Sequence, residues 1–209
     1  SKLIVADPRK IDLAKIADVY LQIRPGTNIA LLNAMMHQII KDGLYDKKYI
    51  EERTEDFAKL ARHVKSFAAE RVAKICGVEA EEIKKAARMY AEAKKAAIYY
   101  AMGITQHISG SHAVMVLSNL AMLCGNIGKE FTGVNPLRGQ NNVQGSCEMG
   151  SLPDELPGDQ KVDNKEMREK FEQAWGMKLP AESGKTLSEI IHGAENGSTR
   201  FLYIMGENP

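Results

Sequence analysis

Several classes of protein are excluded by what this sequence lacks. Its three cysteines, Cys76, Cys124 and Cys147, are widely spaced and form neither a CxxC motif nor a Cys/His pair, which argues against a disulfide framework and structural zinc. The 28 basic and 27 acidic side chains leave a net charge of +1, so no electrostatic footprint for nucleic acid is present. No apolar run approaches the length of a membrane span, and no secretory signal opens the sequence. We therefore expect a cytoplasmic protein in a reducing environment.

The composition is that of an ordinary globular protein, with 209 residues that are 44% hydrophobic and 26% charged. The sequence also lacks a starting methionine. It begins directly on the apolar run 2–6 and stops just after another such run, 201–205. Complete proteins seldom begin and end on core strands, so we interpret the sequence as an internal fragment of a longer polypeptide.

Short apolar runs alternate with helical patterns along the chain. The runs 2–6, 19–23, 96–101 and 200–205 predict strands. Helices are predicted over residues 29–41, 47–53, 55–61, 66–75, 79–95, 110–124, 164–175 and 186–192. This order predicts a three-layer, Rossmann-like α/β fold with a mainly parallel sheet and helices on both faces. The sheet should be incomplete, with apolar edges that favour self-association.

Three predicted strands end in polar or glycine turns, at Asp7, Gly103 and Gly206. Open α/β sheets bind ligands at the carboxyl ends of their strands, so this recurrence indicates a nucleotide site. Asp7 could contact a ribose or base edge, or it could simply cap the turn that follows. His107 lies in the turn after Gly103, and we favour a structural over a catalytic role for it.

One stretch, residues 133–150, has no helical or strand periodicity and reads GVNPLRGQNNVQGSCEMG. It contains four glycines, five carboxamides and a single cation, Arg138. Such a run is usually functional or disordered, and its low charge density argues against disorder. We interpret it as a loop around a polar ligand, in which Arg138 forms a bidentate clamp for a carboxylate or phosphate.

Five segments together resemble the catalytic subunit of molybdenum- or tungsten-dependent formate dehydrogenases, in the molybdopterin oxidoreductase family. They are NPLRGQNNVQG with the following CEMG, MGITQH (102–107), NLAMLCGNIGK (119–129), DPR (7–9) and YIMGENP (203–209). The resemblance covers the chain from end to end. It implies a metal held between two molybdopterin guanine dinucleotide cofactors, reversible oxidation of formate to carbon dioxide, and electron transfer to an iron–sulfur cluster and an electron-acceptor subunit or iron–sulfur protein.

The same resemblance implies roles for individual residues. Arg138 would orient the formate carboxylate beside the metal. The implied cofactor contacts are Gln106 and Gln140 at the pterin, Asp7 and Arg9 near the guanine end, Gly26 and Asn28 in the adjacent turn, Gly103 in its strand-end turn, and Gly206 and Glu207 at the start of a second nucleotide-binding half.

Other family features are missing from this sequence. It has neither the amino-terminal cysteine cluster for a 4Fe-4S centre, nor the cysteine or selenocysteine metal ligand followed by histidine, nor the carboxy-terminal domain that closes over the cofactor. We therefore expect no metal ligand, no bound cofactor and no formate turnover in this chain alone. We expect residues 1–135 to form part of a molybdopterin-dinucleotide-binding α/β domain. Residues 136–209 should form the active-site loop and the return into a neighbouring cofactor-binding domain.

Two other functions remain open at this point. A relative in the same family could act on another oxyanion, such as nitrate. A non-catalytic nucleotide-binding module is the other possibility, although such a module has no evident use for one cation within an amide-rich loop.

Overall fold

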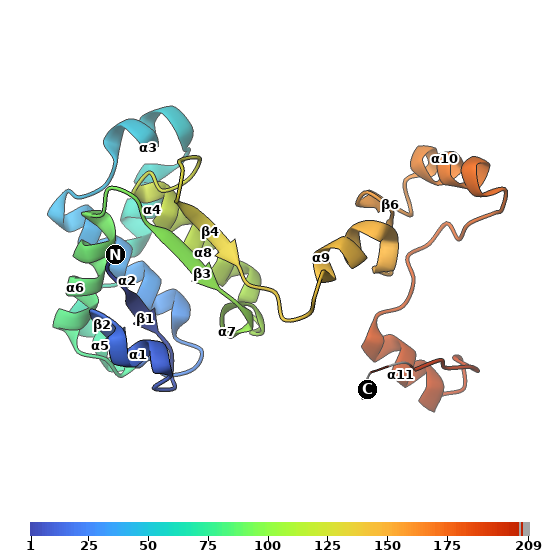
Figure 1. Ribbon diagram of the computed structural model, residues 1–209, viewed down its shortest axis with the longest axis horizontal. Coiled ribbons are helices and arrows are strands. Elements are labelled where there is room, and N and C mark those ends of the chain that lie inside the picture. Colours follow the sequence, from blue (N-terminus) through green and yellow to red (C-terminus); the bar gives the residue numbers. More distant parts are fainter. Residues whose placement is uncertain (205, 207–209) are drawn as a thin grey trace. The chain divides into compact units, whose positions relative to one another are not determined.

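The computed structural model describes residues 1–204 and 206. The chain divides into two compact units, Ser1–Leu137 and Arg138–Pro209 (Figure 1).

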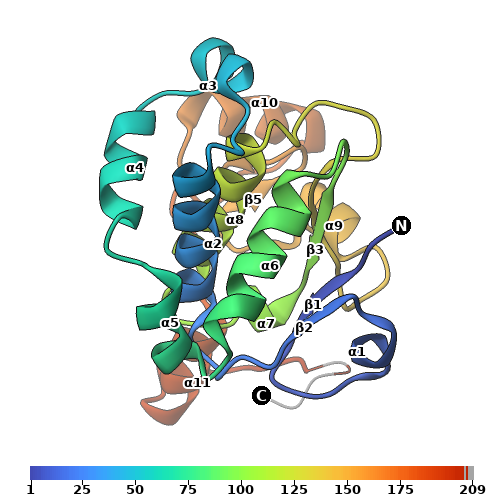
Figure 2. The same cartoon turned by 90° about the vertical axis from the view of Figure 1, so that its left-hand side faces the viewer.

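Helix α2 (Asn28–Asp42) is the centre of the first unit. It packs against α4 (Phe57–Val64), α5 (Ala69–Cys76), α6 (Ala80–Ala91) and α8 (Gly110–Leu123), and Figure 2 shows α4, α5 and α6 around it. Its apolar side chains point in several directions, and most of its middle residues are buried. The helix ends at Gly43, whose left-handed backbone lets its N–H reach the carbonyls of the last turn. The helix predicted over residues 29–41 is confirmed.

The strands of the first unit form two parallel pairs. Strand β1 (Ile4–Ala6) pairs with β2 (Val19–Leu21), and β3 (Ala97–Tyr100) pairs with β4 (Gly133–Pro136). Helix α1 (Asp12–Ile16) connects the first pair, and α7 (Met102–Thr105) and α8 connect the second. Helix α3 (Lys47–Arg53) packs against α8, and α6 packs against β2. The α/β class with parallel strands is confirmed, but the described strands form separate pairs rather than one sheet.

Strand β4 corrects the sequence analysis, which predicted no strand within residues 133–150. Residues Gly133–Pro136 pair in register with β3, with Val134 opposite Ile98. Leu137 N extends the pairing by donating to the Tyr100 carbonyl at 2.7 Å, and the Asn135 side-chain amide donates to the Ile98 carbonyl at 3.2 Å. The hydrogen-bond partners of β4 are main-chain groups of β3. The pattern of side chains within residues 133–136 therefore did not indicate a strand.

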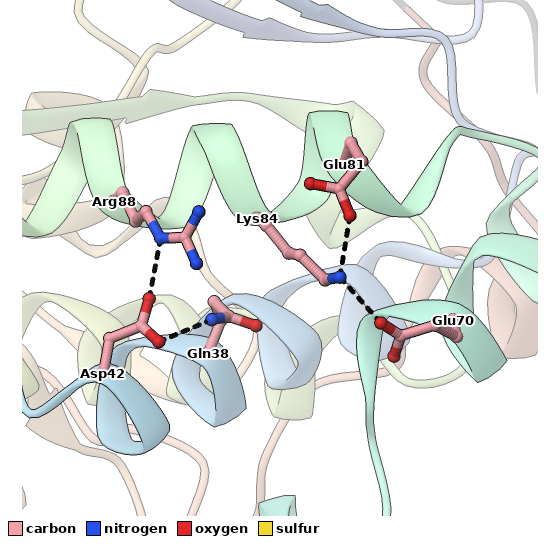
Figure 3. Close-up of polar contacts among 6 residues, drawn as sticks. All are labelled: Gln38, Asp42, Glu70, Glu81, Lys84 and Arg88. Atoms are coloured by element: carbon pink, nitrogen blue, oxygen red, sulfur yellow. Dashed lines mark hydrogen bonds and ion pairs between the residues drawn. The ribbon is translucent and has the colours of Figure 1, made fainter.

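A polar network joins the three helices α2, α5 and α6 (Figure 3). Arg88 on α6 donates to the Asp42 carboxylate on α2 at 2.7 Å. Lys84 on α6 contacts Glu70 on α5 at 2.7 Å and Glu81 one turn earlier at 2.8 Å. Two charged side chains of α6, Arg88 and Lys84, thus reach neighbouring helices.

The second unit begins with α9 (Val143–Ser146) and a π-helical turn (Cys147–Ser151), followed by the small hairpin β5 (Glu155–Leu156) and β6 (Gln160–Lys161). Helices α10 (Lys165–Trp175) and α11 (Leu187–Glu195) follow. A capping box starts α11, because the Thr186 and Glu189 side chains each bond the other's backbone N–H.

The predicted last strand is wrong over its described part. Residues 200–204 form no strand, and Phe201 and Tyr203 are 80% and 78% exposed. No described strand pairs with this segment, so its backbone lacks the partners that would stabilise an extended conformation. Met205 lies outside the described residues. Within the described part of the chain, no helix is long and apolar enough to cross a membrane.

Candidate functional site

Two of the predicted cofactor-binding residues meet in the first unit. The Asn28 side-chain amide, at the start of α2, donates to the Gly103 carbonyl at 3.2 Å, although 75 positions separate the two residues. The His107 ring nitrogen Nε2 lies 3.0 Å from the same carbonyl oxygen. The turn after β3 is therefore attached to the turn before α2, which the sequence alone did not show.

Local packing explains the shape of the turn after β3. A Cβ on Gly110 would collide with the Thr105 carbonyl oxygen, so glycine lets α7 lie directly against the start of α8. A Cβ on Gly103 would meet no atom within 4 Å, so the backbone there is open to a ligand. Gln106 follows α7, is exposed, and donates its N–H to the Met102 carbonyl at 2.9 Å.

The turn after β1 brings Asp7 and Arg9 together. The Asp7 carboxylate accepts a hydrogen bond from the Arg9 backbone N–H at 2.7 Å, and the Tyr20 hydroxyl donates to the Asp7 carbonyl at 3.1 Å. Burial, with a further contribution from the Asp7 charge, raises the pKa of Tyr20. Asp7 thus caps its turn, and the Arg9 residue that it orders is exposed. Gly26 adopts a left-handed φ of 83° with open space around it.

Arg138 lines a hollow of about 350 Å³ in the second unit. The residues around this hollow are Arg138, Val143, Gln144, Cys147, Glu148, Leu152, Glu155 and Asp159. Of these residues, only Arg138 was predicted from the sequence. The carboxylates Glu148, Glu155 and Asp159 were not, and the only pattern that could have indicated them is the high proportion of polar residues in and after the loop.

The charges around this hollow are mixed. One guanidinium faces three carboxylates, of which Glu155 is paired with Lys161 at 2.7 Å. The Gln144 side chain donates to Glu148 at 3.3 Å. An anion in this hollow would therefore be repelled by Glu148 and Asp159 and attracted by Arg138. Its binding would depend on the bidentate hydrogen bonds that a guanidinium can form.

The remaining predicted site residues lie apart from these clusters. Gln140 is exposed in the turn that precedes α9, and Gly206 lies in a bend with a φ of 70°. Glu207 lies outside the described residues. Among the described residues, no group of three or more His, Cys, Asp or Glu side chains could hold a metal ion.

Parallel strand–helix–strand units with polar turns at the strand ends define an α/β protein. The sequence pattern of the molybdopterin oxidoreductase family matches residues 1–209. The chain belongs to this family.

Curated relatives and a solved structure extend the comparison. Formate dehydrogenase H from Escherichia coli is 53% identical over the whole of this chain and 29% of its own length. The F420-dependent formate dehydrogenase subunit alpha from Methanocaldococcus jannaschii is also 53% identical, over the whole chain and 31% of its own length. Acetylene hydratase from Pelobacter acetylenicus aligns with a TM-score of 0.60 and 35% identity over 62% of this chain and 18% of its own. The chain thus spans about a third or less of the curated relatives that it matches.

Proposed function

We propose that this chain is part of the catalytic subunit of a formate dehydrogenase, which oxidises formate reversibly to carbon dioxide. The observation that carries the proposal is the 53% identity to two formate dehydrogenases over the full length of the chain. Arg138 supports formate as the substrate, because a guanidinium matches the two oxygens of a carboxylate and here faces an open hollow.

The donor groups of the first unit fit the nucleotide part of a pterin dinucleotide. Asp7 and Asn28 offer oxygen and amide groups that match the edge of a guanine base, and Arg9 offers a cation for a phosphate. Gly26 and Gly103 leave room for close approach to the backbone. On this proposal, residues 1–135 belong to a molybdopterin-dinucleotide-binding domain.

The second unit would carry the substrate side of the site. Residues 136–209 contain Arg138, which would bind the formate carboxylate and hold its C–H bond toward the metal. Gln140 would contact the pterin, and Gly206 and Glu207 would begin a second nucleotide-binding half. The two electrons from formate would be accepted by molybdenum or tungsten with its pterin ligands, when these are bound. None of the described residues is assigned as the metal ligand.

The wider assignments follow from the same proposal. The cofactor would be the guanine dinucleotide form, and electrons would leave through a 4Fe-4S cluster to an acceptor subunit or iron–sulfur protein. The compartment would be the cytoplasm.

The test is an Arg138→Ala substitution in the complete catalytic subunit. We expect kcat/KM for formate to fall by about 100-fold or more, because a charge-assisted contact to the reacting carboxylate is lost. Lys165→Ala, on the exposed surface of α10, is the control. It also removes one positive charge and should leave kcat/KM unchanged. Metal and guanine nucleotide content would be measured in each variant. Formate oxidation that survives Arg138→Ala would contradict the clamp.

A further inference from the structure

We infer that His107 is a positioning residue for the nucleotide part of the cofactor. With Asn28, it fixes the Gly103 carbonyl and so holds the turn after β3 against the turn before α2. The inference rests on the proposed function, because it concerns the same cofactor site. It adds a residue that none of the roles above assigns to that site.

The chemistry of the contact determines which form of the histidine is present. A carbonyl oxygen can only accept, so the Nε2 atom that lies 3.0 Å from the Gly103 oxygen must carry the hydrogen. The neutral ring is then protonated at Nε2 and bare at Nδ1. The Asn28 side-chain nitrogen donates to the same oxygen at 3.2 Å, so both lone pairs of the Gly103 carbonyl are used.

The position of this contact explains why the helix stops where it does. In a longer helix, the Gly103 carbonyl would accept from the backbone N–H four residues later, which belongs to His107. Helix α7 instead ends at Thr105, and the His107 side chain takes the place of its own backbone N–H. The side chain thus satisfies a carbonyl at the helix end and leaves the chain free to turn at Gln106.

Such a turn should matter for binding more than for stability. Both hydrogen bonds are exposed to solvent, so their net contribution to folding is small. They do, however, join two turns that the nucleotide would contact together. A ligand that meets a turn already held in place loses less conformational entropy on binding.

The test uses the complete catalytic subunit, prepared without its cofactor, and guanosine 5′-diphosphate as the probe, with affinities measured by titration calorimetry. His107→Ala and Asn28→Ala should each weaken binding by about fivefold to tenfold, the value of one hydrogen bond, with thermal midpoints unchanged. His107→Gln should stay within about twofold of the parent chain, because the glutamine amide can donate from nearly the position of Nε2. His112→Ala, an exposed histidine on α8, is the control and should have no effect.

A second measurement needs no ligand. Nitrogen-15 NMR of the ring should show neutral His107 protonated at Nε2, whereas a free histidine would exchange between tautomers. Dominance of the Nδ1-protonated form, or alanine variants that bind as the parent does, would overturn the positioning role alone. If the cofactor-free parent subunit does not bind the nucleotide at all, the proposed nucleotide site fails as well.

Discussion

Asp42 joins α2 to α6, and its replacement by alanine tests this network. The Asp42 carboxylate accepts from the Gln38 side chain at 2.8 Å and from Arg88 at 2.7 Å (Figure 3). Gln38 is only 3% exposed, so water cannot replace its lost partner.

The size of the effect follows from this difference in exposure. A buried donor without its acceptor costs about 1–3 kcal/mol. The Arg88 side chain is 46% exposed and is therefore expected to recover most of its hydration. Asp42→Ala should thus lower the free energy of unfolding by about 2 kcal/mol at neutral pH. Asp42→Asn should cost less, because its amide oxygen can still accept from Gln38.

The loss should depend on pH in one direction. Hydrogen bonds from Gln38 and then Arg88 lower the pKa of Asp42 in the folded chain. A carboxyl whose folded pKa is lowered contributes stability above its unfolded value, near pH 4, and loses it as the pH falls through the folded value. The difference between the parent chain and Asp42→Ala should therefore be complete near pH 7 and shrink below about pH 4.

Urea unfolding followed by far-ultraviolet circular dichroism is the suitable assay. The single tryptophan, Trp175, lies in the second unit and does not report on α2. Asp12→Ala is the control, because the Asp12 side chain is 95% exposed and its pair with Lys15 should contribute little. Equal losses for Asp42→Ala and Asp12→Ala at neutral pH, or a difference between the parent chain and Asp42→Ala that does not shrink in acid, would refute the reasoning.

Two further predictions concern a glycine and the cysteines. Gly125→Ala should destabilise the chain by about 3 kcal/mol, because its φ of 63° is left-handed and a Cβ would press on the Asp46 carboxylate. Gly128→Ala should cost only about 1 kcal/mol, because its φ of 74° is also left-handed but the space around it is open. Equal losses in urea unfolding would show that the contact is unimportant. Among the cysteines, Cys147 should react first with a thiol reagent, because burial raises the pKa of the other two thiols, that of Cys124 to about 12. A fast phase that survives Cys147→Ser would contradict this order.

The parts of the fold that the sequence predicted are those determined by local pattern. The apolar residues of α2 recur on every side of the helix, and the helix is buried accordingly. The capping box at Thr186 and Glu189 depends on residues three positions apart, and its geometry is present. In each case, the information lies within a few turns of the chain.

The parts that the sequence missed depend on distant partners. Residues Gly133–Pro136 form a strand because their backbone is hydrogen-bonded to that of β3. Residues 200–204 form none because no described strand lies alongside them. The contact between Asn28 and Gly103 joins residues 75 positions apart. Their residue types indicated a ligand site, but only the folded chain, in which α2 packs against α8, shows that they meet.

The strand that the sequence missed ends beside the end of its partner strand. Strand β3 ends at Tyr100, just before the turn that contains Gly103. The hydrogen bond from Leu137 N to the Tyr100 carbonyl ties the end of β4 to that strand end. Leu137 is thus the last residue of the first unit to be held by this strand pair. Parallel pairing places the carboxyl ends of both strands at one edge, which is where α/β proteins of this class bind their ligands.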